Sequence, residues 1–214
     1  TIRAAFEQGV NFFDTAEGYG SAEAFLGKAA APFRDQVYIA TKLSGKSGSP
    51  DLSYHAVHQA CEDSLKRLKM DVIDLYQVHF DDPQTPVLET ITALEDLVAE
   101  GKIRQYGLCH LSQESVKDYA ESGHPFSILM ELSPVARTSM TTLLPVCQAH
   151  NMAACPSSVP GRGILSGRYS PEHQFEEGDI RRIDPLFNRD RFESAIRVRE
   201  KLAMLGEGYG ASAV

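Results

Sequence analysis

The sequence predicts an α/β fold whose parallel strands form a (β/α)8 TIM barrel. Short apolar or β-rich runs alternate with helix-periodic runs, and this repetition indicates parallel strands joined by helical crossovers. The glycine-rich phosphate loops typical of open doubly wound sheets are absent from the sequence. Three consecutive predicted strands also end on an ionisable residue. Strand ends converge on one face of a barrel, so such residues would meet there.

Six strands are predicted from apolar and β-branched runs bounded by turn residues. They cover residues 10–13, 37–41, 72–78, 103–109, 126–132 and 152–157. The first three strands are followed by Asp14, Lys42 and His79. One ionisable residue at a strand end is common, but three in succession favour a shared site.

Two helices have clear predicted boundaries. One covers residues 86–100, with Thr85 as N-cap, Pro86 in the first turn and Gly101 as the stop signal. The other covers residues 52–68, with Asp51 as N-cap. Apolar residues recur every three or four positions in each helix, which predicts one buried face. These residues are Val87, Ile91, Leu94 and Leu97 in the first helix and Val57, Cys61, Leu65 and Leu68 in the second.

Length and charge exclude several classes of protein. The 214 residues are 43% hydrophobic, which predicts one domain over residues 1–214 with a continuous core. The 21 Lys and Arg residues against 29 Asp and Glu residues give a net charge of -8, the wrong sign for a nucleic-acid partner. No apolar run approaches the length of a membrane span, so we expect no membrane partner.

The cysteine pattern predicts reduced thiols in a cytoplasmic protein. The four cysteines form no CxxC pair, and the opening residues show no secretory signal. His55, His58 and Cys61 recur at spacings of three, but structural zinc needs about four ligands and no second pair is near. We therefore expect no metal site. The four cysteines are Cys61, Cys109, Cys147 and Cys155.

Several motifs are specific enough to compare with known families. Residues 9–20 read GVNFFDTAEGYG and are followed by Ser21, Glu23 and Leu26-Gly27. Further motifs are IATK at 39–42, SLKRL at 64–68, DVIDLYQVH at 71–79, GKIRQYG at 101–107 and GRGILSG at 161–167. Together they resemble the aldo-keto reductase family, and the resemblance covers nearly the whole chain.

This resemblance implies an oxidoreductase that reduces a small-molecule aldehyde or ketone to an alcohol with NADPH. Four catalytic residues carry over, Asp14, Tyr19, Lys42 and His79. Tyr19 would donate a proton to the carbonyl oxygen, and the charge of Lys42 would lower the pKa of that phenol. Asp14 would hold Lys42 in place, and His79 would orient the carbonyl oxygen by a hydrogen bond.

Several cofactor positions depart from the family pattern. Cys109-His110 stands where Ser-Asn is usual, Leu129 replaces a glutamine, and Ser157 replaces an aromatic residue that stacks on the nicotinamide. Arg162 lies between two glycines, which favours a pyrophosphate contact over the alternative of a simple turn. The cofactor-binding residues predicted in this way are Cys109, His110, Ser157, Gly161, Arg162 and Gly163.

The strand count predicts an incomplete barrel, with the first and last strands absent. A complete barrel takes about 250 residues and eight strands. Three explanations stay open: a partial chain of a normal reductase, a homo-oligomer whose partner strands complete the sheet, or a shortened barrel. A shortened barrel predicts a cofactor-independent lyase, dehydratase or cyclase that reuses the same four residues. A further alternative is a non-enzymatic subunit that senses a nicotinamide, although the presence of all four residues argues against it.

Residues 169–191 carry mixed charges and turn residues, which predicts a long surface loop. Arg181 and Arg182 lie in this segment. Contact with an anionic ligand and simple solvation are both compatible with two exposed arginines, and we favour solvation.

Overall fold

The computed structural model describes residues 1–44 and 50–212, which form two compact units. The first unit comprises Thr1–Leu129 and Leu143–Cys155, and the second comprises Met130–Thr142 and Pro156–Val214. The prediction that residues 1–214 make one domain stays a prediction. Within the described residues, no helix combines the length and apolarity needed to cross a membrane.

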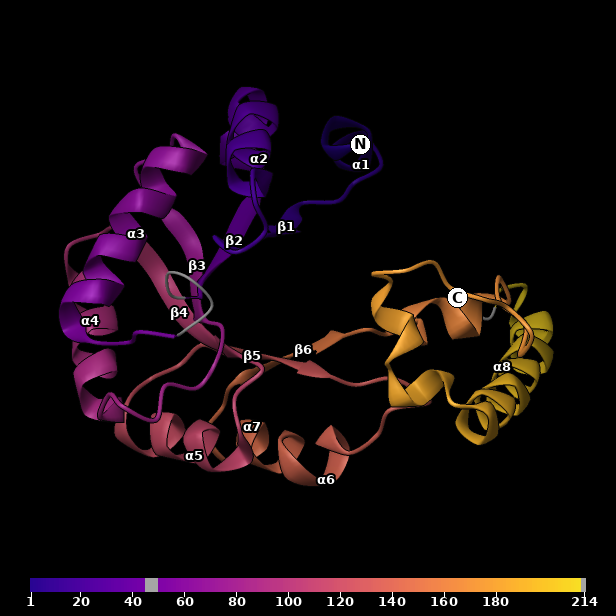
Figure 1. Ribbon diagram of the computed structural model, residues 1–214. Coiled ribbons are helices and arrows are strands. Elements are labelled where there is room, and N and C mark those ends of the chain that lie inside the picture. The colour runs from indigo at the N-terminus through magenta and orange to yellow at the C-terminus, as the bar shows by residue number, and fades with distance from the viewer. Residues whose placement is uncertain (45–49, 213–214) are drawn as a thin grey trace. The chain divides into compact units, whose positions relative to one another are not determined.

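One sheet contains six strands in the order of the sequence (Figure 1). Strands β1 to β5 pair in parallel, with Asp14 opposite Ala40 and Lys42 opposite Gln77. This is the strand order of an incomplete (β/α)8 barrel, and the predicted fold class is confirmed. Predicted and observed boundaries differ by two residues at most. The strands are β1 (Phe12–Asp14), β2 (Tyr38–Leu43), β3 (Ile73–Val78), β4 (Ile103–Cys109), β5 (Ser127–Glu131) and β6 (Ala153–Ser157).

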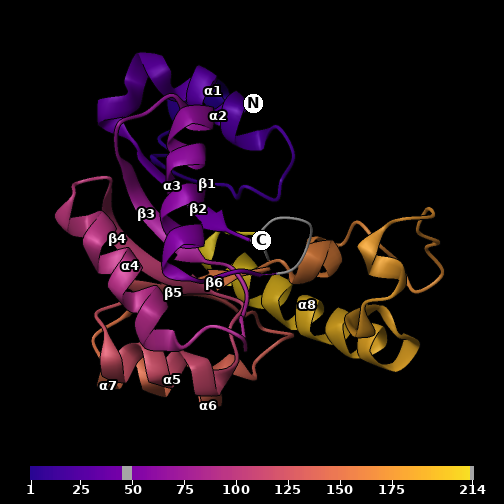
Figure 2. The ribbon, with the colours of Figure 1, turned by 60° about the vertical axis from the view of Figure 1, so that its left-hand side comes forward.

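Helices connect the strands, and α3 and α4 lie side by side against β2 to β4 (Figure 2). The apolar stripes predicted for these two helices are buried, except that Val87 is only half-buried. The prediction of one inward face for each helix is thus confirmed. The helical elements up to β6 are α1 (Ile2–Glu7), α2 (Ala22–Ala30), η1 (Ala31–Gln36), α3 (Tyr54–Leu68), α4 (Val87–Ala99), α5 (Gln113–Ser122), α6 (Ser139–Thr142) and α7 (Leu144–Ala149).

Both predicted N-caps are wrong by one or two residues. Helix α3 has Ser53 as its N-cap, because the Asp51 carboxylate accepts a hydrogen bond from the Ser53 N–H (3.1 Å) in a turn before the helix. Helix α4 has Pro86 as its N-cap. The Thr85 hydroxyl instead donates to Asp82 Oδ2 (2.6 Å). Local turns that precede each helix therefore engage the predicted capping groups.

Gly27 allows the close approach of α2 to α3, and this gives a stability prediction. A Cβ at Gly27 would lie 2.0 Å from the backbone oxygen of Leu68, the last residue of α3. Since a backbone atom cannot turn aside as a side chain can, Gly27→Ala should lower the free energy of unfolding by about 2–3 kcal/mol. Urea denaturation measures this change.

The matched control is Gly208→Ala in α8, where nothing lies within 4 Å of an added Cβ. Alanine there should be neutral or slightly stabilising, because it has the higher helix propensity. Equal stabilities of the two variants would show that the α2–α3 contact has no such steric limit.

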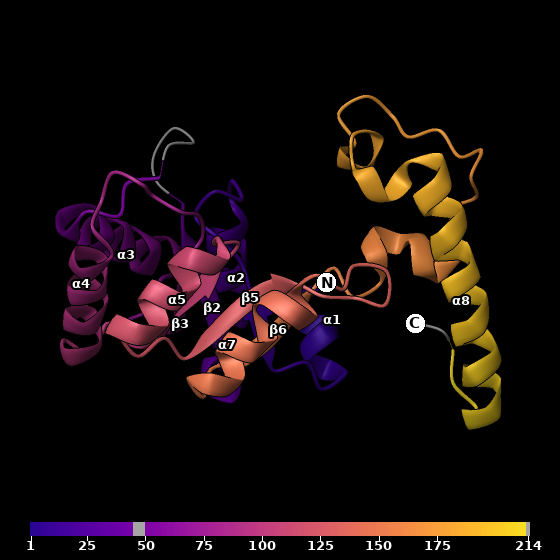
Figure 3. The ribbon, with the colours of Figure 1, turned by 90° about the horizontal axis from the view of Figure 1, so that it is seen from below.

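The second unit has its own core, formed where α8 (Arg189–Tyr209) packs on η3 (Gly161–Ser166) and η5 (Pro185–Phe187) (Figure 3). The buried residues of this core are Ile164, Leu165, Tyr169, Phe192 and Ala195.

The segment predicted as a surface loop is more ordered than expected. It contains η4 (Ile180–Arg182), and the buried Tyr169 ring contacts Phe175 and Phe187, with centroids 5.1 and 6.4 Å away. Arg182 is exposed, as expected for a solvated side chain. Arg181 is only partly exposed, because its guanidinium pairs with Asp179 and donates to the Tyr169 hydroxyl. Aromatic residues within the segment supply the small core that the charge pattern did not indicate.

Candidate active site

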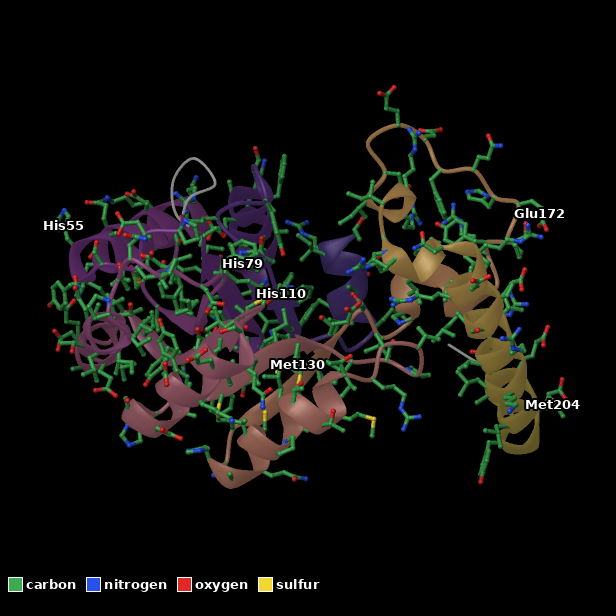
Figure 4. The ribbon with its side chains drawn as sticks, turned by 60° about the horizontal axis from the view of Figure 1, so that its bottom comes forward. His55, His79, His110, Met130, Glu172 and Met204 are labelled. Atoms are coloured by element: carbon green, nitrogen blue, oxygen red, sulfur yellow. The ribbon has the colours of Figure 1, made fainter. Side chains whose placement is uncertain are left out.

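Three strand ends of the first unit bring ionisable side chains to one edge of the sheet. Asp14 is the last residue of β1, Lys42 lies one residue before the end of β2, and His79 directly follows β3. Parallel pairing in register places these ends side by side. Figure 4 shows His79 beside His110, which follows β4, and the centroids of the two rings are 6.2 Å apart. The expected convergence of strand ends is therefore present.

Lys42 is fully buried, and its ammonium group has two fixed partners. It forms an ion pair with Asp14 Oδ1 and donates to the Thr15 carbonyl oxygen at 2.8 Å. The other oxygen of Asp14 accepts a hydrogen bond from Gln77 Nε2 at 3.0 Å. A desolvated ammonium paired in this way keeps one position, which is what an electrostatic role near a reacting oxygen requires.

Tyr19 lies in the loop between β1 and α2, over the Lys42 ammonium. Backbone hydrogen bonds from Thr15 to Ala40 (2.9 Å) and from Glu17 to Lys42 (3.1 Å) hold this loop along β2. Lys42 Nζ is 5.2 Å from the centroid of the Tyr19 ring. The same ring meets His79 edge-on, with centroids 5.8 Å apart. The phenol and imidazole thus share one side of the site with the buried charge.

The pKa of Tyr19 corrects one expectation. Partial burial, the Asp14 carboxylate and Cys109 together raise the pKa of the Tyr19 phenol above its usual value near 10.0. The expected net lowering of this pKa is not found, because burial and the Asp14 carboxylate act in the opposite direction. Tyr19 is consequently protonated at neutral pH, which is the state that a proton donor needs.

His79 is buried and neutral. Burial, with the charges of Lys42 and His110, lowers the pKa of the imidazole to about 4. Its Nδ1 atom lies 2.6 Å from Ser44 Oγ. Sequence reasoning missed Ser44, although successive side chains of a strand alternate between faces and Ser44 comes two residues after Lys42. That spacing was the available signal.

Three of the departures at cofactor positions lie in the first unit. Cys109 ends β4, and burial raises the pKa of its thiol to about 12. Cys109 pairs in register with Leu129 of β5, and the His110 N–H donates to the Leu129 carbonyl oxygen at 3.4 Å. His110 adopts a left-handed backbone conformation (φ 51°) directly after β4 ends.

The remaining predicted cofactor residues belong to the second unit. Ser157 ends β6, and its hydroxyl is buried without a hydrogen-bond partner among the described residues. Arg162 forms ion pairs with Asp184 and Glu131. Its guanidinium, which was predicted to contact a pyrophosphate, is therefore paired with carboxylates. The cofactor-binding role of these residues stays a prediction.

Gly161 and Gly163 have a local structural role. Both adopt positive φ angles, +58° and +95°. A Cβ would lie 2.8 Å from Val135 Cγ2 at the first position and 2.9 Å from Tyr169 Cε2 at the second. The turn therefore needs glycine for its own packing, whether or not it also binds a phosphate.

The His55, His58 and Cys61 series lies on α3, and Figure 4 places His55 far from His79. Cys61 is fully buried, while the His58 ring packs on Tyr54, with centroids 4.6 Å apart. In the part of the chain that the structure describes, no group of three or more His, Cys, Asp or Glu side chains is placed to hold a metal ion.

The aldo/keto reductase family model matches residues 1–214. The chain belongs to the aldo/keto reductase family. It is similar to the aldo-keto reductase YhdN of Bacillus subtilis (strain 168), with 35% identity over 100% of this chain and 67% of that protein. The chain spans about two thirds of the length of the curated family members it matches.

Solved structures of family members share the fold. The glycerol dehydrogenase AKR11B4 from Gluconobacter oxydans has a TM-score of 0.90 and 31% identity, over 100% of this chain and 68% of that one. An aldo-keto reductase from Klebsiella pneumoniae in complex with NADPH has a TM-score of 0.70 and 27% identity, over 99% of this chain and 66% of that one. The six strands described here therefore have counterparts in longer aldo/keto reductases.

Proposed function

We propose that this aldo/keto reductase chain carries the catalytic groups of an NADPH-dependent carbonyl reductase, with Tyr19 as the general acid. One observation supports this most strongly: a protonated phenol lies over a buried ammonium and beside a neutral imidazole. Family membership and the NADPH complex of the Klebsiella relative agree with it. The proposed substrate is a small-molecule aldehyde or ketone.

Each of the four residues has a distinct part in the proposed reaction. When bound, NADPH supplies the hydride that reaches the carbonyl carbon, and negative charge then develops on the carbonyl oxygen. The Tyr19 hydroxyl donates its proton to that oxygen. Lys42, held by Asp14, stabilises the phenolate that forms on Tyr19. His79 donates a second hydrogen bond to the oxygen and orients it.

The residues present fit a nicotinamide cofactor in part. The His110 ring and the Cys109 thiol offer hydrogen-bonding groups at the edge of the site, and the unpartnered Ser157 hydroxyl offers a donor and an acceptor. Arg162 would exchange its carboxylate partners for a phosphate group. We therefore propose that Cys109, His110, Ser157, Gly161, Arg162 and Gly163 bind the cofactor, on the strength of the family pattern.

Titration with NADPH followed by fluorescence, and then an aldehyde assay with nitrobenzaldehyde, tests the proposal. Saturable binding with NADPH consumption supports a reductase. Binding without turnover would favour the nicotinamide-sensing alternative. Absence of binding would contradict the proposal and favour the cofactor-independent alternative.

The pH dependence of carbonyl reduction should be flat over a wide range. With the pKa of His79 near 4 and that of Tyr19 above 10.0, both groups keep their working protonation states between about pH 5 and pH 9. The rate should fall towards pH 4, because protonated His79 adds a second positive charge beside Lys42. It should also fall above pH 10, where the phenol ionises. A fall centred near pH 6.5 would contradict a neutral, buried His79.

Circular dichroism at each pH separates loss of structure from loss of chemistry. The folded pKa of His79 lies below its ordinary value of 6.5, so the unfolded chain binds this proton first as the pH falls. The contribution of neutral His79 to the free energy of unfolding is therefore complete above about pH 6.5 and is lost as the pH falls towards 4.

We also propose a reducing compartment such as the cytoplasm. All four cysteines are free thiols in the structure, and none of their positions suggests a disulfide framework.

A further inference from the structure

We infer that Ser44 is a positioning residue that sets the tautomer of His79. In this inference the Ser44 hydroxyl donates its proton to His79 Nδ1, so the single proton of the neutral ring resides on Nε2. The assigned direction of this hydrogen bond and its catalytic consequence rest on the proposed function, whereas the tautomer itself is measured on the free protein.

The contact between the two side chains is short and lies inside the site. Ser44 Oγ is 2.6 Å from Nδ1, and His79 as a residue is only 4% exposed. The Phe80 ring stacks on the imidazole, with centroids 4.2 Å apart and planes 13° from parallel. Packing and one hydrogen bond therefore fix the orientation of the ring. Nδ1 of His79 faces the hydroxyl of Ser44. The tautomer of His79 therefore depends on whether Ser44 Oγ or His79 Nδ1 carries the proton of this hydrogen bond.

The surroundings of Ser44 hold its hydroxyl against the imidazole. The Ser44 N–H donates to Glu17 Oε1, and the Glu17 carboxylate also lies 3.7 Å from Arg67 Nη2. A Cβ at Gly18 would lie 3.4 Å from Ser44 Oγ, so this glycine leaves room for the hydroxyl. The loop that carries Tyr19 thus also fixes the residue that contacts His79.

The direction of the hydrogen bond is inferred from the role proposed for His79, since a neutral ring carries its one proton on either Nδ1 or Nε2. Burial of the imidazole, with the charges of Lys42 and His110, disfavours a second proton on the ring. If Nδ1–H donated to the serine, Nε2 would be a bare acceptor and would repel a developing oxyanion. If the serine donates to Nδ1, Nε2–H becomes a donor, and the oxyanion can accept from both His79 and Tyr19. Only the second arrangement gives His79 the role that the proposed reaction requires.

Nitrogen NMR of the ligand-free 214-residue chain at neutral pH tests the tautomer directly. The His79 signals are assigned by their loss in His79→Gln. We expect a protonated Nε2 and an unprotonated, hydrogen-bonded Nδ1 in the wild type. Ser44→Ala should shift both ring signals towards a mixture of tautomers, and Ser44→Thr, which keeps the hydroxyl, should restore them. Ser122→Ala, at the exposed end of α5, is the matched control and should change neither signal.

The steady-state kinetics give a second, independent readout. Ser44→Ala should lower kcat about 10-fold to 100-fold and leave the KM for NADPH within about twofold, because it weakens one hydrogen bond to the oxyanion. Ser44→Thr should recover most of the loss. If Ser44→Ala acted through a general packing defect, the hydroxyl of Ser44→Thr would not restore both the tautomer and kcat.

The inference is overturned by a proton on Nδ1 in the wild type, or by ring signals that Ser44→Ala leaves unchanged. These results are distinguishable from failure of the proposed function. If the wild type reduces no aldehyde but Ser44→Ala shifts the tautomer, the inference stands and the proposed function fails. If the wild type reduces aldehydes while Ser44→Ala alters neither the NMR signals nor kcat, the inference fails alone.

Discussion

Tyr19→Phe is expected to lower kcat for carbonyl reduction about 10³-fold and to leave the Kd for NADPH within about twofold, the size of effect that loss of a general acid produces. Phenylalanine keeps the aromatic ring that lies over Lys42 and beside His79. The substitution therefore removes the hydroxyl with little change in packing. The Tyr19→Phe variant should therefore still bind NADPH but reduce the carbonyl far more slowly.

Steady-state kinetics with an aldehyde measure kcat, and a fluorescence titration with NADPH measures the Kd. Tyr209→Phe, at the exposed end of α8, is the matched control and should retain wild-type values for both. Retention of a tenth or more of the wild-type kcat by Tyr19→Phe would assign the proton donor to another group, such as His79.

The Asp14–Lys42 ion pair should respond unequally to removal of its two charges. Asp14→Asn leaves a fully buried ammonium without its counter-charge, which we expect to lower the free energy of unfolding by about 3 kcal/mol. Lys42→Met leaves a carboxylate that is 32% exposed and still accepts from Gln77, so the loss should be nearer about 1 kcal/mol. Both variants should lose carbonyl reduction, because Tyr19 then lacks the fixed charge that stabilises its phenolate.

A double-mutant cycle measured by urea denaturation tests this difference. Asp14→Asn combined with Lys42→Met should be more stable than Asp14→Asn alone, since no uncompensated charge remains buried. Its activity should stay absent. Equal losses from the two single variants would show that burial of the ammonium is not the dominant cost.

The sequence predicted the sheet and the strand-end residues because both depend on local patterns. Apolar runs fix where strands lie, and parallel pairing then brings Asp14, Lys42 and His79 to one edge. The helix starts were less accurate, since Asp51 and Thr85 find partners in turns whose geometry the pattern does not reveal.

Contacts between distant segments were beyond sequence reasoning. The pKa of Tyr19 rises because the phenol is partly buried and lies near Asp14 and Cys109, and no sequence pattern gives the balance of these effects. The Arg162–Asp184 pair joins residues 22 positions apart through a segment predicted to be solvated. Family resemblance named the residue types at the site, but their protonation states required coordinates.

The buried Cys109 thiol has a consequence for the chemistry that an aldehyde reductase must tolerate. Aldehydes are electrophiles, and the thiolate is the form of cysteine that attacks their carbonyl carbon. With a pKa of about 12, Cys109 stays in the S–H form at every pH at which the proposed enzyme would work. The sulfur would therefore not capture the proposed aldehyde substrate as a hemithioacetal.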